Sequence, residues 1–142
     1  MIKPHRGRPR RIKPRDMAKT MYDNYTLTTA EERLADIIWR EAPIASPDLV
    51  DIALRTLGWK KSTTYTVLRR LCDKEIFVND NALVKTATTR EELSAYQSRS
   101  FVNSSFGGSL PGFIASFFSG KKLSSKEADE LKQLIEAHQE EN

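Results

Sequence analysis

The sequence predicts a mainly α-helical fold that carries one small β-hairpin, followed by a second helical region. Three amphipathic segments with helix-breaking residues between them occupy residues 28–74. Two short runs of strand-forming residues, 76–79 and 82–85, then flank a polar turn at Asp80-Asn81. Three helices followed by a hairpin are the order of a winged helix-turn-helix domain, so we expect this fold with a helical C-terminal extension.

The first helix, predicted over residues 28–40, has a clear start signal. Thr28 is followed three positions later by Glu31, so each side chain can bond a free backbone amide in a capping box. Leucine and isoleucine side chains then recur at helical spacing on one face. Pro43 cannot continue a helix, so we expect the helix to end before it.

The second helix is predicted over residues 46–57. The hydroxyl of Ser46 is expected to cap it, Pro47 suits its first turn, and Asp48 lies near the positive end of the helix dipole. Gly58 is a natural C-terminal stop.

The third helix, predicted over residues 62–74, has two different faces. At about 100° per residue, one arc is expected to face the core and carries Thr64, Val67, Leu68 and Leu71. The opposite arc carries hydroxyl, aromatic and guanidinium groups, which can bond base edges or touch a thymine methyl in a major groove. The alternative is that Tyr65 packs under the hairpin and Arg69 reaches only phosphate. The predicted DNA-binding residues of this region are Lys60, Lys61, Ser62, Thr63, Tyr65, Thr66, Arg69, Arg70 and Lys85.

Basic residues are clustered along the chain. The net charge is +4, yet residues 1–25 hold eight Lys and Arg against Asp16 and Asp23. Residues 55–74 hold six basic residues against Asp73, whereas residues 123–142 hold two against six acidic ones. Clustered basic charge is typical of a phosphate-binding surface, although a solvated basic face has the same composition.

In its motifs, the chain resembles the penicillinase-repressor (BlaI/MecI) family of winged helix-turn-helix transcriptional regulators. The resemblance covers about residues 27–140 and depends on four pieces in the family's order. These are Thr29-Ala30-Glu31 with Ile37-Ile38-Trp39, then Thr63-Thr64-Tyr65-Thr66-Val67-Leu68-Arg69-Arg70-Leu71, then Phe106-Gly107-Gly108-Ser109-Leu110, and finally Leu123-Ser124-Ser125-Lys126-Glu127-Ala128-Asp129-Glu130-Leu131.

The resemblance implies a homodimer that binds a palindromic operator and whose C-terminal helices intertwine. A helical tail this apolar would otherwise expose large patches, which agrees with a dimer. The alternative is that the same residues close one larger monomeric core. The residues that the resemblance places at the dimer interface are Phe101, Leu110, Phe113, Ile114, Phe117, Leu131, Leu134 and Ile135.

The resemblance also implies inactivation by proteolysis in the C-terminal helical region. The matching bond is Ser116–Phe117, where relatives commonly carry Asn–Phe. A membrane sensor-protease is the family's usual inducer route and is therefore an expected partner.

The N-terminal tail departs from the family, whose members usually begin a few residues before the first helix. We expect residues 1–25 to be a flexible basic tail. Its Arg6-Gly7-Arg8-Pro9-Arg10 segment resembles an AT-hook, in which Arg6, Arg8 and Arg10 would enter the minor groove of A·T-rich DNA. The alternative is a tail that adds only non-specific phosphate affinity.

Other classes of protein find little support in the sequence. We expect no enzyme, because the chain lacks a His-containing triad and a phosphate-cradling glycine loop. We expect neither cofactor nor metal site, because Cys72, His5 and His138 are its only cysteine and histidines. Cys72 is interpreted as a small core residue. A lone cysteine fits a cytoplasmic location, and no membrane span or secretory signal is predicted.

Three regions are therefore predicted: the basic tail 1–25, a winged helix-turn-helix domain 26–87 and a helical dimerisation region 88–142. The predicted function is transcriptional repression by a homodimer bound to double-stranded operator DNA. The alternatives are a nucleoid-type architectural protein that binds A·T-rich DNA broadly, and a winged-helix module that binds proteins.

Overall fold

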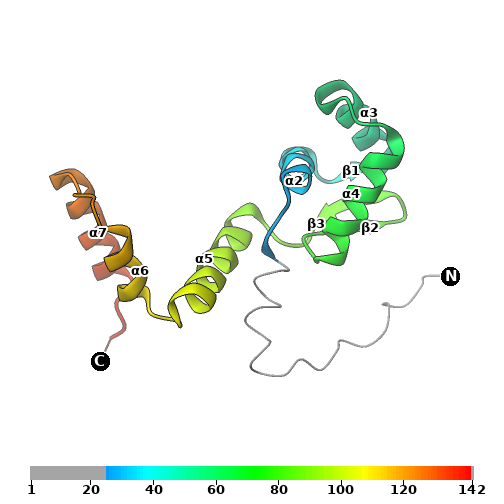
Figure 1. Ribbon diagram of the computed structural model, residues 1–142. Helices are drawn as coiled ribbons and strands as arrows, with labels where there is room; N and C mark the ends of the chain where they lie inside the picture. Colours follow the sequence, from blue (N-terminus) through cyan, green and yellow to red (C-terminus); the bar gives the residue numbers. More distant parts are fainter. Residues whose placement is uncertain (1–24, 142) are drawn as a thin grey trace.

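The computed structural model describes residues 25–141 and is mostly helical, with one small antiparallel sheet (Figure 1). The three helices and hairpin predicted from the sequence are all present, and three further helices follow, the last of which ends at Ala137. In chain order the elements are α2 (Thr29–Glu41), β1 (Ile44–Ala45), α3 (Ser46–Leu57), α4 (Lys61–Asp73), β2 (Phe77–Asp80), β3 (Leu83–Thr86), α5 (Arg90–Phe106), α6 (Leu110–Phe117) and α7 (Ser125–Ala137). This arrangement confirms the predicted fold class.

The predicted start of α2 is confirmed in detail. The Thr28 hydroxyl accepts the amide of Glu31 at 3.1 Å, and the Glu31 carboxylate accepts the amide of Thr28 at 2.9 Å. Thr89 and Glu92 form a second capping box at the start of α5. Gly58 ends α3 in the left-handed conformation that glycine adopts without strain.

The predicted cap of the second helix is wrong. Ala45, rather than Ser46, is the N-cap of α3, and no side chain caps this helix end. The reason is the short strand β1, which the sequence analysis missed. Because β1 pairs antiparallel with β3, the Ser46 amide donates to the carbonyl of Ala82 at 2.8 Å, and the chain turns from strand directly into helix.

The wing is a three-stranded sheet in the order β1-β3-β2. Strands β2 and β3 begin and end one residue later than predicted, so the two-residue turn between them is Asn81-Ala82. Both turn residues have positive φ, 50° and 65°. These are the conformations of a type I′ turn, which matches the twist of a hairpin, and here the turn forms without glycine.

The hydrophobic core lies between the first three described helices and the wing. Its buried side chains include Leu34, Ile38, Leu49, Ala53, Val67, Leu68, Leu71, Ile76, Phe77 and Val84. The four residues predicted on the inward arc of α4 are all buried, and Cys72 packs against the core as a half-buried side chain. The buried hydroxyl of Thr64 has no hydrogen-bond partner among the described residues.

The C-terminal helices extend away from this core (Figure 1). The helix α5 was predicted to end near Phe101, but it continues to Phe106 and ends at Gly107, which has a φ of 57°. The rings of Phe101, Phe106 and Phe113 contact one another across the α5–α6 corner, with centroids 5.4 to 5.9 Å apart. In contrast to α2 and α4, neither α6 nor α7 contains a buried residue.

Candidate nucleic-acid interface

The outward face of α4 is open along its whole length. Eight of the nine residues predicted to contact DNA in this region are exposed, and Tyr65 is half-buried. Seven of the nine lie on α4, while Lys60 is its N-cap and Lys85 lies on β3. The buried arc of α4 fixes the direction of this face, because the same helix cannot turn without exposing its apolar side chains.

Two polar side chains on this face are already hydrogen-bonded within the protein. The Tyr65 hydroxyl donates to the Ser46 hydroxyl at 3.3 Å, which joins α4 to the start of α3. The Thr66 hydroxyl donates to the Ser62 carbonyl at 2.9 Å. Each of these hydroxyls keeps lone pairs that can accept a further bond, whereas the Arg69 and Arg70 guanidinium groups form no ion pair with residues 25–141.

The wing presents a mixed surface beside this face. Lys85 Nζ lies 3.5 Å from an Asp80 carboxylate oxygen, and about half of each side chain is exposed. An exposed pair of this kind contributes little to stability, so Lys85 can exchange its partner for another anion at small cost. Val78 and Leu83 are exposed apolar side chains on the same hairpin.

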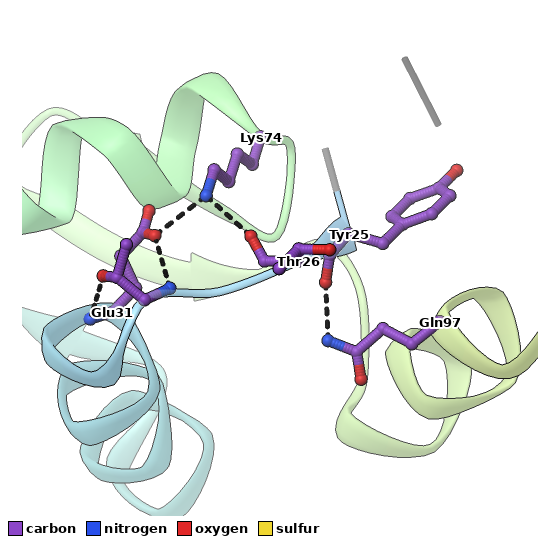
Figure 2. Close-up of polar contacts among 6 residues, drawn as sticks. Tyr25, Thr26, Glu31, Lys74 and Gln97 are labelled. Carbon is purple, nitrogen blue, oxygen red and sulfur yellow. Dashed lines mark hydrogen bonds and ion pairs between the residues drawn. The ribbon is translucent and has the colours of Figure 1, made fainter. Parts of the chain in front are cut away.

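The C-terminal end of α4 is fixed by a contact that the sequence analysis missed. Lys74 Nζ donates to Glu31 Oε1 at 2.8 Å and to the Thr26 carbonyl at 2.9 Å (Figure 2). The Glu31 side chain is only 1% exposed. Burial alone would raise the pKa of Glu31, but the bonds from Lys74 and Thr28 outweigh it, so the pKa lies below its ordinary value. Glu31 therefore caps α2 and anchors α4 at the same time.

Most of the residues predicted at the dimer interface form an open apolar surface on the last three helices. Leu110, Phe117, Leu134 and Ile135 are exposed by 50% or more, and Phe101 by 38%. Phe113, Ile114 and Leu131 are half-buried and line a groove of about 330 Å³ between α6 and α7, together with Phe117, Phe118, Leu123 and Leu134. This surface has no cover within the described residues.

The bond predicted to be cleaved lies at the end of α6. Ser116 and Phe117 are both exposed and both helical. Arg6, Arg8 and Arg10 of the AT-hook-like segment lie outside the described residues.

Residues 25–141 show no sign of a metal centre or a membrane span. No three metal-ligating side chains are grouped in this part of the chain. No helix in the same range combines the length and apolar character needed to cross a membrane.

The fold and the exposed basic helix define a winged helix-turn-helix protein with a helical C-terminal extension. Residues 27–137 match the family model described as penicillinase repressor. The chain belongs to this family, as its sequence motifs predicted.

Three curated relatives match most of their own length. The penicillinase repressor of Bacillus licheniformis is 28% identical over 116 residues, which cover 79% of this chain and 91% of the relative. The penicillinase repressor of Staphylococcus aureus is 22% identical over 113 residues, covering 77% and 90%. The methicillin resistance regulatory protein MecI of Staphylococcus epidermidis is 23% identical over 115 residues, covering 78% and 94%. The family model and two of these relatives are named as repressors, and the third is named as a regulatory protein.

Proposed function

We propose that this chain is a transcriptional repressor that binds a palindromic operator as a homodimer. The observation that carries the proposal is the outward face of α4, where Ser62, Thr66 and Arg69 lie exposed above a buried arc. An arginine and two hydroxyls on one exposed helix face match the donors and acceptors of base edges in a major groove. Lys60 and Lys61, at the start of the same helix, supply charge for the flanking phosphates.

The proposed dimer forms through the apolar surface of α6 and α7. In a larger monomeric core these helices would pack on α2 to α4, but neither of them contains a buried residue. Ile135 and Leu134 are exposed by 65% and 56%, which is costly for side chains of this kind in water. A second copy of the chain would cover them and give the two-fold symmetry that a palindrome requires.

The proposed release from the operator is cleavage of the Ser116–Phe117 bond by a membrane sensor-protease. This cut would separate Phe117, Phe118 and the whole of α7 from α5, and so divide the proposed dimer surface. The helix α6 has only eight residues. Because isolated helices shorter than about 12 residues are marginal in water, its last turn can open to fit a protease at little cost.

The experiment that tests the proposal is a footprint of the purified full-length chain on DNA upstream of its own gene. The buffer is at physiological salt and contains excess competitor DNA. The proposal requires a protected palindrome with two half-sites. Protection spread over any A·T-rich stretch would favour an architectural protein, and binding that disappears with competitor would favour a module that binds proteins.

A further inference from the structure

A cluster of side chains joins α5 to the DNA-binding domain, and neither the fold class nor the proposed function accounts for it. The Arg90 guanidinium lies 4.7 Å from the centre of the Trp39 ring and 2.7 Å from an Asp36 carboxylate oxygen. Trp39 donates its indole N–H to the carbonyl of Thr88 at 2.9 Å, immediately before α5 begins. Leu93, one turn further along α5, is buried in the core of the domain.

A second set of contacts holds the same helix about two turns further along, at Tyr96 and Gln97. The Gln97 amide donates to the Tyr25 carbonyl at 2.5 Å (Figure 2), and the rings of Tyr25 and Tyr96 stack with centroids 4.9 Å apart. The adjacent residue, Thr26, accepts the bond from Lys74 at the end of α4. The segment 25–26 therefore connects α5 to the C-terminal end of α4, the helix proposed to bind DNA.

These contacts all come from the first half of α5. Arg90, Leu93 and Gln97 recur at helical spacing, so they lie on one face of the helix, toward the domain. The second half of α5 leads to the apolar surface of α6 and α7 (Figure 1). The N-terminal half of α5 is thus fixed to the domain, and its C-terminal end leads to the proposed dimer surface.

A small change in the direction of α5 would have a large effect on DNA spacing. With 17 residues and a rise of about 1.5 Å per residue, α5 is about 25 Å long, and a tilt of about 10° at its base moves its far end by about 4 Å. One base-pair step is about 3.4 Å. A tilt of this size therefore displaces the end of α5 by about one base-pair step. The direction of α5 can thus determine which spacing of half-sites the two protomers of a dimer contact.

We propose that the junction formed by Arg90 on Asp36 and Trp39, and by Gln97 on Tyr25, sets the spacing between half-sites that the dimer accepts. The proposal rests on the proposed function, since it requires a dimer on a palindrome. Arg90 and Gln97 are positioning residues. They do not contact the bases, but they fix the direction of α5, which connects the DNA-binding domain of each protomer to the dimer surface.

The test is selection of bound sites from duplex DNA that carries a random tract, by the full chain and by its variants. The spacing of each enriched palindrome is then read by sequencing. The variants are Arg90→Ala and Gln97→Ala, which remove the two sets of contacts separately, with Arg90→Lys as the conservative rescue. Arg99→Ala is the matched control, because Arg99 is an exposed arginine on α5 without an ion pair to residues 25–141. Circular dichroism verifies that each variant is folded.

The wild type and Arg99→Ala are expected to enrich one spacing. Arg90→Ala and Gln97→Ala should enrich the same half-site over neighbouring spacings, with the preference for the original spacing falling about threefold, as for loss of an exposed ion pair. Arg90→Lys should restore the preference. An equal loss of affinity at every spacing would overturn the inference and leave the repressor proposal intact. A wild type that enriches no spaced palindrome would overturn both.

Discussion

Glu31 in the first turn of α2 and Lys74 after the last turn of α4 form an ion pair 2.8 Å long, although 43 residues separate them in the chain. The carboxylate is buried, so its charge is stabilised by this contact and by the capping bond to Thr28 rather than by water. The pair joins the start of the domain to the C-terminal end of α4, the helix proposed to bind DNA. It therefore links the stability of the fold to the position of the surface that is proposed to bind DNA.

This ion pair gives the stability of the protein a specific dependence on acidity. The folded-state pKa of Glu31 is lowered from its ordinary value of 4.5, so the carboxylate stabilises the fold above that pH. The contribution is lost as the pH falls below about 4.5 and through the folded-state pKa. Urea unfolding of the wild type and Glu31→Gln should therefore give a stability difference that is constant near neutral pH and shrinks at acid pH.

The matched control for this experiment is Glu32→Gln, because Glu32 is the exposed neighbour of Glu31 and forms no ion pair with residues 25–141. Its stability curve should run parallel to that of the wild type. Parallel curves for Glu31→Gln as well would show that the buried pair does not stabilise the native state.

Arg69 is the residue on the outward face of α4 that should distinguish operator from random DNA. A guanidinium bonded to a base is worth about 1–3 kcal/mol of discrimination. We expect Arg69→Ala to lose about tenfold or more in operator affinity beyond its loss on random duplexes, measured by fluorescence anisotropy at fixed salt. Arg33→Ala, on α2 and also exposed, is the control. Equal losses on both kinds of DNA would mean that Arg69 contacts only phosphate.

The apolar surface of α7 should determine the oligomeric state. Ile135→Glu places a charge where the proposed partner protomer packs, so sedimentation is expected to show a monomer at concentrations at which the wild type is a dimer. Gln133→Glu adds the same charge to the same helix, at another exposed position, and should remain dimeric. An unchanged dimer in Ile135→Glu would show that the interface lies elsewhere.

The basic tail should act on the flanks of the operator. Replacing Arg6, Arg8 and Arg10 together by alanine keeps the length of the tail and removes the guanidinium groups of its AT-hook-like segment. We expect weaker binding mainly on operators with A·T-rich flanks, where the minor groove is narrow. Gel-shift titrations on operators with the two types of flank measure this difference. An equal loss of affinity on G·C-rich flanks would show that the tail contacts phosphates without preference for sequence.

The sequence was sufficient for elements with strong periodicity or a cap. The two faces of α4 followed from helical spacing alone, and Thr28 with Glu31 predicted the start of α2. The strand β1 escaped because two residues are too few to show alternation, and Ser46 was consequently assigned a capping role that it does not have. The extent of α5 was underestimated because its serine-rich second half has no regular apolar pattern.

Contacts between distant parts of the chain could not be predicted in this way. The pairing of Lys74 with Glu31 and of Gln97 with Tyr25 depends on how helices pack, which spacing along one helix does not determine. One local feature hinted that Glu31 would be buried: this capping residue lies one turn before Leu34, at the start of the apolar face of α2. For the proposed interface, the exposed face was predictable, whereas the bond from Tyr65 to Ser46 was not.

Repression itself is measured most directly by transcription in vitro from the chain's own promoter, with purified polymerase and increasing amounts of the protein. We expect transcript to fall as the footprinted palindrome fills, and Arg69→Ala at the same concentration to leave transcript near its starting level. Transcript that stays constant while the palindrome is fully occupied, or that rises, would contradict repression.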